Sequence, residues 1–166
     1  MSAFIPLTRG LVAEVDDPDF AWLSRVKWMA QVFENSCYAV RFVGNRHTRK
    51  PCYTHRVILG APAHLQVDHI DGDGLNNQRN NIRLCTKSQN MAHCGLRRNN
   101  TLGAKGVVLT LDGRARKHRA RITCGLDVFH LGSFHTLREA AAAYNRKATE
   151  LFGPFALLND LEVLPC

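Results

Sequence analysis

Apolar positions near the start of the chain fall into short runs separated by turn signals. After the apolar run at 11–15, they predict strands over 30–33 and 38–43, with a third strand near Cys52-Tyr53 after a turn at Gly44-Asn45. Aspartates just before Phe20 suit the N-terminus of a short helix, because carboxylates there meet unpaired backbone amides. Residues 1–50 are therefore expected to form a small β-rich part.

The pattern changes between residues 51 and 98. Two short apolar runs, 67–70 and 82–85, flank an excursion rich in Asn, Asp and Gly, which predicts a strand, an irregular loop and a second strand. Thr86-Lys87-Ser88-Gln89 has the signature of a capping box, so a helix is expected to start there and run towards Leu96. This segment is predicted to be a ββα unit.

The basic and polar stretch Arg97-Arg98-Asn99-Asn100 predicts a linker over 99–104 to a third segment, 105–160. Strands are expected over 106–111, 117–123 and 128–134, with Asp112-Gly113 as a hairpin turn. A second capping box at 136–139 opens a helix with apolar positions at a spacing of three to four residues. The fold class predicted for the whole chain is α+β, ending in a three-stranded antiparallel sheet packed on one helix.

The net charge of the chain narrows the classes of molecule that it is expected to bind. With 22 Lys and Arg against 14 Asp and Glu the net charge is +8, which favours a polyanion: nucleic acid first, an anionic membrane surface second. No apolar run approaches the roughly 18 residues needed to span a membrane, and no signal pattern is seen, so a cytoplasmic protein without membrane contact is expected. Six cysteines without a Cys-x-x-Cys pair predict buried or idle thiols and no structural zinc.

Four residues in the middle segment carry chemistry: Asp68, His69, Asn81 and Asn90. The oxygens of Asp68 and Asn90 suit a hard divalent ion, Mg²⁺ or Mn²⁺, and neutral His69 can take a proton from water near pH 7. Neighbours on a strand point to opposite faces, so Asp68 and His69 are expected at the strand's end. Asn81 is expected to support the loop or the His69 ring rather than to react.

These residues lie in a recognisable context. Val67-Asp68-His69-Ile70-Asp71-Gly72-Asp73, then Asn81-Ile82-Arg83, then Ser88-Gln89-Asn90 resembles the HNH homing endonuclease motif of phages and introns. The resemblance implies a ββα-metal (His-Me finger) core with Asp68 and Asn90 as metal ligands, His69 as general base and Asn81 as the central structural asparagine. Asp71 stands where the family often has asparagine and Ile82 where it often has leucine, and neither departure is expected to matter for catalysis.

Other positions are candidates for DNA contact. His55 and Arg56 precede the motif, and either pack the short helix there or meet a phosphate. The basic turn at 46–50 is either a solvated hairpin end or a phosphate contact. Arg97, Arg98 and Lys105 flank the linker and are expected to meet phosphates without reading sequence.

The third segment resembles the AP2 DNA-binding domain over about 55 residues. The resemblance rests on 105–107, 119–122, 130–134, 139–144 and 157–159. It implies DNA contacts from the sheet face and from one helix residue: Lys105, Thr110, Arg119, Arg121, Thr123, His130 and Tyr144. Val108 replaces the usual arginine and His130 the usual tryptophan, so base preference does not transfer.

The leading hypothesis is a metal-dependent endonuclease acting on double-stranded DNA without a small-molecule cofactor; the sequence leaves its oligomeric state open and favours a monomer. It would work in the interior of a host cell if phage-encoded. One alternative is a sequence-specific DNA-binding regulator with an inactive nuclease core. Another is an RNA-binding or RNA-cutting protein, although single-strand readers usually expose aromatic rather than arginine side chains on a sheet.

Overall fold

The computed structural model describes residues 1–110 and 118–165. The chain divides into two compact units, residues 1–86 and 87–166, in place of the predicted boundaries near 50 and 98. Leu111, the hairpin turn Asp112-Gly113 and Lys117, which belong to predicted elements of the third segment, lie outside the described residues.

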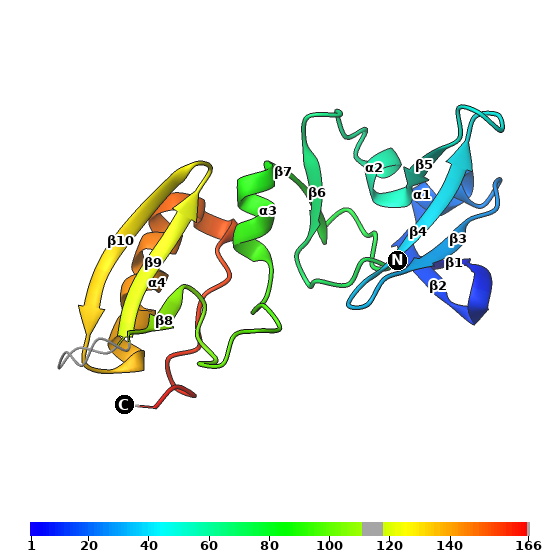
Figure 1. Ribbon diagram of the computed structural model, residues 1–166. Helices are drawn as coiled ribbons and strands as arrows, with labels where there is room; N and C mark the ends of the chain where they lie inside the picture. The colour runs from blue at the N-terminus through cyan, green and yellow to red at the C-terminus, as the bar shows by residue number, and fades with distance from the viewer. Residues whose placement is uncertain (111–117, 166) are drawn as a thin grey trace. The chain divides into compact units, whose positions relative to one another are not determined.

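Residues 1–86, all of which are described, form a mixed α/β unit with three small antiparallel sheets. The observed strands lie within a few residues of the predicted ones, and β1 was not predicted. The elements are β1 (Ser2–Pro6), η1 (Thr8–Gly10), β2 (Val12–Asp16), α1 (Asp17–Leu23), β3 (Met29–Val32), β4 (Cys37–Val43), β5 (Lys50–Tyr53), α2 (Thr54–Ile58), β6 (Gln66–His69) and β7 (Ile82–Cys85). The sheets are β1-β2, β3-β4-β5 and β6-β7 (Figure 1).

One hydrophobic core joins the predicted first and middle segments. Its buried members come from strands and helices throughout the unit: Ile5, Ala13, Val15, Leu23, Trp28, Ala39, Ile58 and Ile82. A two-stranded sheet is at best marginally stable in water, and β1-β2 and β6-β7 each have only two strands. The N-terminal strands and the ββ part of the motif therefore fold as one unit.

The irregular stretch between β6 and β7, the 70–81 loop, is attached to this unit by backbone hydrogen bonds to β2 and by close packing on β4. Glu14 in β2 donates its N–H to Leu75 O (2.9 Å) and accepts from Asn77 N–H (2.7 Å). A Cβ on Gly74 would lie 2.3 Å from Cys37 O and 2.5 Å from the Tyr38 ring. Only glycine permits so close an approach of the loop to β4.

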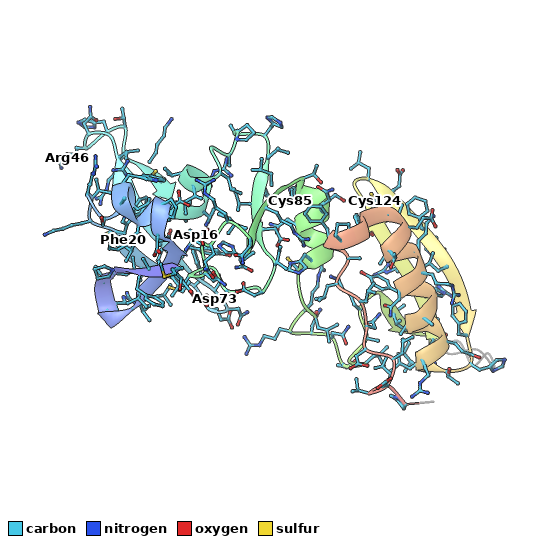
Figure 2. All side chains as sticks on the ribbon, turned by 180° about the vertical axis from the view of Figure 1, so that it is seen from behind. Asp16, Phe20, Arg46, Asp73, Cys85 and Cys124 are labelled. Atoms are coloured by element: carbon cyan, nitrogen blue, oxygen red, sulfur yellow. The ribbon has the colours of Figure 1, made fainter. Side chains whose placement is uncertain are left out.

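An ion pair between buried Asp19 and exposed Arg79 forms a further anchor of the same loop. Arg79 Nε lies 2.8 Å from Asp19 Oδ2, Arg79 Nη2 lies 2.8 Å from Asp19 Oδ1, and Asp16 Oδ2 accepts from Arg79 N–H at 2.8 Å. Figure 2 labels Asp16, whose side chain makes no capping hydrogen bond to α1. Asp17 and Asp19 occupy the first turn of α1, but Asp16 and Asp19 also bind the loop, a role that local pattern did not reveal.

The second unit contains the predicted three-stranded sheet and long helix. Its elements are α3 (Lys87–His93), β8 (Val107–Leu109), β9 (His118–Cys124), β10 (Asp127–Phe134), α4 (Leu137–Phe152) and η2 (Gly153–Phe155). The strands are antiparallel in the order β10-β9-β8, and α4 covers one face of the sheet (Figure 1). The predicted capping box is confirmed: Thr136 Oγ1 accepts from Glu139 N–H, and Glu139 Oε2 accepts from Thr136 N–H.

The helix α3 and the predicted linker both belong to this unit. Ala92 of α3 packs with Ile122 and Tyr144, and the helix ends at His93, short of the predicted Leu96. Residues 99–104 are not a free linker, because Ala104 is fully buried in the core and Asn100 holds the turn before it. The helix of the predicted ββα unit thus shares a hydrophobic core with the sheet that follows it.

The anchor between Asp19 and Arg79 yields a stability prediction. Asp19→Asn keeps the size of the side chain but removes the charge that binds Arg79, so the free energy of unfolding of the first unit should fall by about 1–3 kcal/mol. Both tryptophans, Trp22 and Trp28, lie in this unit, so urea unfolding followed by tryptophan fluorescence reports on it.

Asp17→Asn is the matched control, since Asp17 lies in the same first turn but is exposed. It should change the unfolding free energy by less than about 0.5 kcal/mol. Equal stability of the two variants would show that the ion pair does not anchor the loop.

Candidate active site

The predicted Asp68-His69 pair occupies the last two positions of β6, where both residues are still paired with β7. In the antiparallel pairing with β7, Asp68 stands opposite Arg83 and His69 opposite Ile82. Asp68 and His69 are 5% and 6% exposed. Both side chains therefore lie in a largely water-free setting, at successive positions of the paired strand.

Arg83 provides the counter-charge for Asp68. Arg83 Nε donates to Asp68 Oδ2 at 2.8 Å, and Arg83 Nη2 lies 2.8 Å from the same oxygen. A buried carboxylate is costly unless it is paired and hydrogen-bonded. Sequence reasoning assigned Arg83 no role, although opposite positions of the predicted β6-β7 pair would have brought it beside Asp68.

Asn77 orients the ring of His69. Asn77 is fully buried, and its Nδ2 donates to Leu75 O at 2.9 Å, which leaves Oδ1 as the acceptor 3.4 Å from His69 Nε2. With the Nε2 proton directed at Asn77, Nδ1 is the ring nitrogen that can accept a proton. Burial lowers the pKa of His69, against opposing effects of Asn77 and of the nearby carboxylates, so the neutral ring prevails at pH 7.

Aromatic side chains from the β4-β5 hairpin enclose the two histidines. The ring of His55 meets that of His69 edge-on, with centroids 5.1 Å apart, and stacks on Tyr53 at 5.4 Å. Tyr38 lies 5.9 Å from His69. These packing contacts fix the plane of the His69 ring, in addition to the hydrogen bond between His69 Nε2 and Asn77 Oδ1.

His55 is not presented to solvent. It is 8% exposed, and its Nδ1 has no hydrogen-bond partner among the described residues. Burial and the neighbouring His69 lower the pKa of His55 to about 3, so the ring is neutral at physiological pH. Of the two interpretations of His55, the structure supports packing: His55 lies in α2 and its buried ring packs on Tyr53 and His69.

Arg56 is occupied in the same way. Its guanidinium donates to Leu65 O (2.9 Å), Ala61 O (3.2 Å) and Pro62 O (2.9 Å) and so closes the turn after α2. The carbonyls of Leu65 and Ala61 would lose this donor if the guanidinium swung out to a phosphate, whereas Pro62 O also accepts from Leu65 N–H. Arg56 thus has a structural role in the turn, and its expected phosphate contact stays a prediction.

Asn81 ties together the two ends of the 70–81 loop. Its Nδ2 donates to Asp71 Oδ1 (2.8 Å) and Asn76 O (2.9 Å), its Oδ1 accepts from Asp71 N–H (3.1 Å), and its backbone O accepts from Ile70 N–H (2.8 Å). These side-chain hydrogen bonds go to the loop rather than to His69. Asn81 thus lies where it can hold the loop, while the contact to the imidazole comes from Asn77.

The expected second metal ligand, Asn90, lies in α3 and thus in the second unit, whereas Asp68 lies in the first. Within the described residues no group of three His, Cys, Asp or Glu side chains is arranged to hold a metal ion. One carboxylate and one amide oxygen, completed by phosphate and water, would not form such a group. The described cysteines are free thiols, and burial raises the pKa of Cys85 to about 11.

The exposed face of the second unit's sheet carries much of the expected DNA-contact set. Arg119, Arg121 and Thr123 of β9 are exposed and alternate with buried Ala120 and Ile122, as the sequence pattern predicted. His130 of β10 is exposed and stands opposite Arg121. Arg97 and Arg98 are exposed before the sheet, and Thr110 is half-buried after β8.

Two members of the expected set have structural roles instead. Tyr144 is 4% exposed in the core, packs against Gly106, and has its pKa raised to about 12 by burial. Lys105 Nζ donates to Ala92 O and Cys94 O at the end of α3, and burial lowers its pKa. Burial argues against the expected DNA contact of Tyr144, whereas that of Lys105 stays a prediction.

Comparison with known proteins identifies the segment that holds these residues. Residues 52–92 match the family model described as HNH endonuclease, a range that includes Asp68, His69, Asn81 and Asn90. The chain is also similar to a protein of Acanthamoeba polyphaga mimivirus named as an uncharacterized HNH endonuclease, with 28% identity over 93% of this chain and 78% of the viral one. No solved structure matches.

No helix among the described residues is long and apolar enough to cross a membrane. The chain thus contains an HNH endonuclease domain and is an enzyme of the nuclease class.

Burial of neutral His55 yields a prediction for stability against pH. The folded pKa of about 3 lies below the ordinary 6.5, so between these values the unfolded chain binds a proton that the folded chain excludes, and stability falls as the pH falls. At about pH 5 the contribution lost is of the order of 2 kcal/mol. His55→Gln has no such titration, so the stability advantage of the native chain over the variant should shrink by this amount between pH 7 and pH 5. Urea unfolding followed by tryptophan fluorescence measures it. An advantage that is the same at both pH values would show that His55 is not held neutral.

Proposed function

We propose that this nuclease is a metal-dependent DNA endonuclease of the HNH homing type, with His69 as general base and an AP2-like second unit that directs it to its site. The observation that carries the proposal is the His69 ring, neutral, buried beside Asp68 and fixed by Asn77 and His55. The matched HNH endonuclease segment contains all four residues that the chemistry requires. HNH endonucleases act on DNA, and the net charge of +8 suits that substrate.

The proposed chemistry begins with proton transfer to His69. Its Nδ1 would accept a proton from the attacking water, because Nε2 is directed at Asn77 Oδ1. The lowered pKa keeps the ring in the form that can accept this proton. Packing by Tyr38 and His55 limits rotation of the ring, so the base is oriented before substrate binds.

Asp68 and the amide oxygen of Asn90 would hold the divalent ion. Both are hard oxygen donors of the kind that Mg²⁺ and Mn²⁺ prefer, and a carboxylate with a fixed orientation, as Asp68 has beside Arg83, fits this role. When bound, such an ion neutralises charge that grows on the phosphate and on the leaving 3′ oxygen. Arg83 would keep the Asp68 carboxylate in a single orientation for that purpose.

The second unit would recognise the DNA site that is cut. A basic sheet face can enter the major groove, and an arginine there can bond a guanine edge at two points. Arg119, Arg121, Thr123 and His130 are the exposed residues of β9 and β10 suited to this contact. Arg97 and Arg98 would add phosphate contacts that raise affinity without specifying sequence.

Cleavage should depend on His69. With supercoiled plasmid and magnesium, His69→Ala should reduce the rate of nicking or linearisation by about 10²–10⁴-fold, since it removes the base. His64→Ala is the matched control, because His64 is an exposed histidine of the same unit, and it should cut like the native protein. Excess chelator should abolish cleavage by every variant.

Two results would contradict this assignment. Equal activity of His69→Ala and His64→Ala would remove His69 from the chemistry. A native protein that shifts plasmid in a gel but leaves it intact across magnesium and manganese concentrations would favour the DNA-binding regulator with an inactive core.

Recognition of the DNA sequence by the sheet of the second unit gives a separate prediction. Arg121→Ala should relax or abolish site preference and leave the rate of the chemical step within about threefold, because removal of a base contact costs about 1–3 kcal/mol of discrimination. Arg146→Ala, an exposed arginine on α4 of the same unit, removes the same charge and should preserve site preference. Sequencing of the cut ends from a genomic digest measures the preference. Unchanged cut sites with Arg121→Ala would exclude β9 as the reader.

A further inference from the structure

An uninterrupted basic region surrounds the β4-β5 hairpin of the first unit. From residue 35 to residue 67 the chain has five Lys or Arg residues and no Asp or Glu. The outer part of the hairpin, residues 42–50, is exposed throughout and contains Arg46, His47, Arg49 and Lys50. The function proposed above assigns none of these residues a role.

The turn at the end of this hairpin has a defined conformation. Asn45 Oδ1 accepts from His47 N–H (3.0 Å), Thr48 N–H (3.1 Å) and the Thr48 hydroxyl (3.0 Å), and Thr48 Oγ1 accepts from Asn45 N–H (3.2 Å). Gly44 has φ +102°, and a Cβ there would lie 2.6 Å from Thr48 O. The sequence thus fixes a tight turn that presents its flanking cations, where a loose polar loop would have served solubility equally well.

The cations at this turn are available for an external anion. Among the described residues, no carboxylate forms an ion pair with Arg46, Arg49 or Lys50. The Arg49 guanidinium lies over the Phe42 ring at 4.3 Å, which orients it while leaving its charge unneutralised. Figure 2 labels Arg46, which is exposed at the turn of this hairpin. Such a group of cations has the chemistry to bind successive phosphates.

The opposite end of the same hairpin reaches the active site. Tyr38, near the start of β4, packs on His69, and Tyr53, at the end of β5, stacks on His55. The distance along β4 from Tyr38 to Val43 is about 17 Å at roughly 3.3 Å per residue. Because a DNA strand rises about 3.4 Å per nucleotide, this length corresponds to about five base pairs.

We propose that the β4-β5 hairpin is a second DNA-docking element, whose tip binds backbone phosphates of duplex DNA about five base pairs from the phosphate cut at His69. The inference rests on the proposed function and adds a contact surface in the catalytic unit itself. It places sequence-independent affinity next to the chemistry, separate from the sheet of the second unit. Duplex DNA is the occupant, because it is the substrate proposed for His69 and its backbone offers successive phosphates to the exposed cations of this turn, which no described carboxylate pairs.

The test compares two double variants that remove the same charge from the same unit. Arg46→Gln with Lys50→Gln alters the tip, and Arg25→Gln with Lys27→Gln, at exposed positions after α1, is the control. Arg49 is left in place because it packs on Phe42. Binding is measured by fluorescence anisotropy on a labelled random-sequence duplex of about 30 base pairs, at several salt concentrations between about 50 and 200 mM.

The tip variant should bind about tenfold more weakly at the lowest salt concentration, and the slope of log K against log salt should decrease in magnitude by about 2, near 0.9 for each phosphate that is no longer neutralised. The control variant should match the native protein in both quantities. At saturating protein, the plasmid nicking rate of the tip variant should remain within about threefold of the native rate, because the tip does not touch the reacting atoms.

The outcomes separate this inference from the proposed function. If the native protein cuts plasmid and the two variants bind the duplex alike, the docking element is excluded and the nuclease assignment stands. If the native protein does not cut, the proposed function fails. The comparison of duplex binding by the two variants still decides whether the hairpin binds DNA. Weaker binding to a single-stranded RNA of equal length, with duplex binding unchanged, would also overturn the proposal.

Discussion

The active site depends on the attachment of one irregular segment, the 70–81 loop, to the N-terminal part of the chain. A stretch so rich in Asn, Asp and Gly has no regular hydrogen-bond ladder of its own. Glu14 supplies backbone partners, buried Asp19 binds Arg79, and the lack of a side chain at Gly74 allows contact with β4. The residues that precede the motif are therefore part of the catalytic unit.

This attachment determines the chemistry available at His69. Asn77 belongs to the attached loop, and its amide can orient the imidazole only because its backbone is bonded to Glu14 and its Nδ2 to Leu75. Burial alone would leave a histidine neutral without fixing which nitrogen carries the proton. Burial together with one hydrogen bond to a fully buried amide does both, so the base is in the required protonation state and orientation before DNA arrives.

The sequence pattern was sufficient to predict those features of the fold that depend on interactions between residues close together in the chain. The capping box that opens α4, the strands β6 and β7, and the alternation of Arg119 and Arg121 with Ala120 follow from neighbouring residues. Contacts between distant residues could not be predicted: the partner of Arg79 lies 60 residues earlier in the chain. The burial of His55 and Tyr144 was missed for the same reason, because amphipathic rings are common both in cores and on binding surfaces. Resemblance to a DNA-binding motif indicated their positions but not their exposure.

The β4-β5 hairpin connects catalysis and docking through strand register. Val40 pairs with Tyr53 and Val43 with Lys50, so a single register sets both the aromatic packing around the histidines and the exposure of the cations at the tip. A slip of one residue would exchange the two faces of a strand, turning Tyr53 away from His55 while displacing the turn that Asn45 stabilises. The geometry of the base and that of the basic tip are therefore not independent: a sequence change that preserves the turn and its register preserves the distance between the reacting phosphate and the phosphates held beside it.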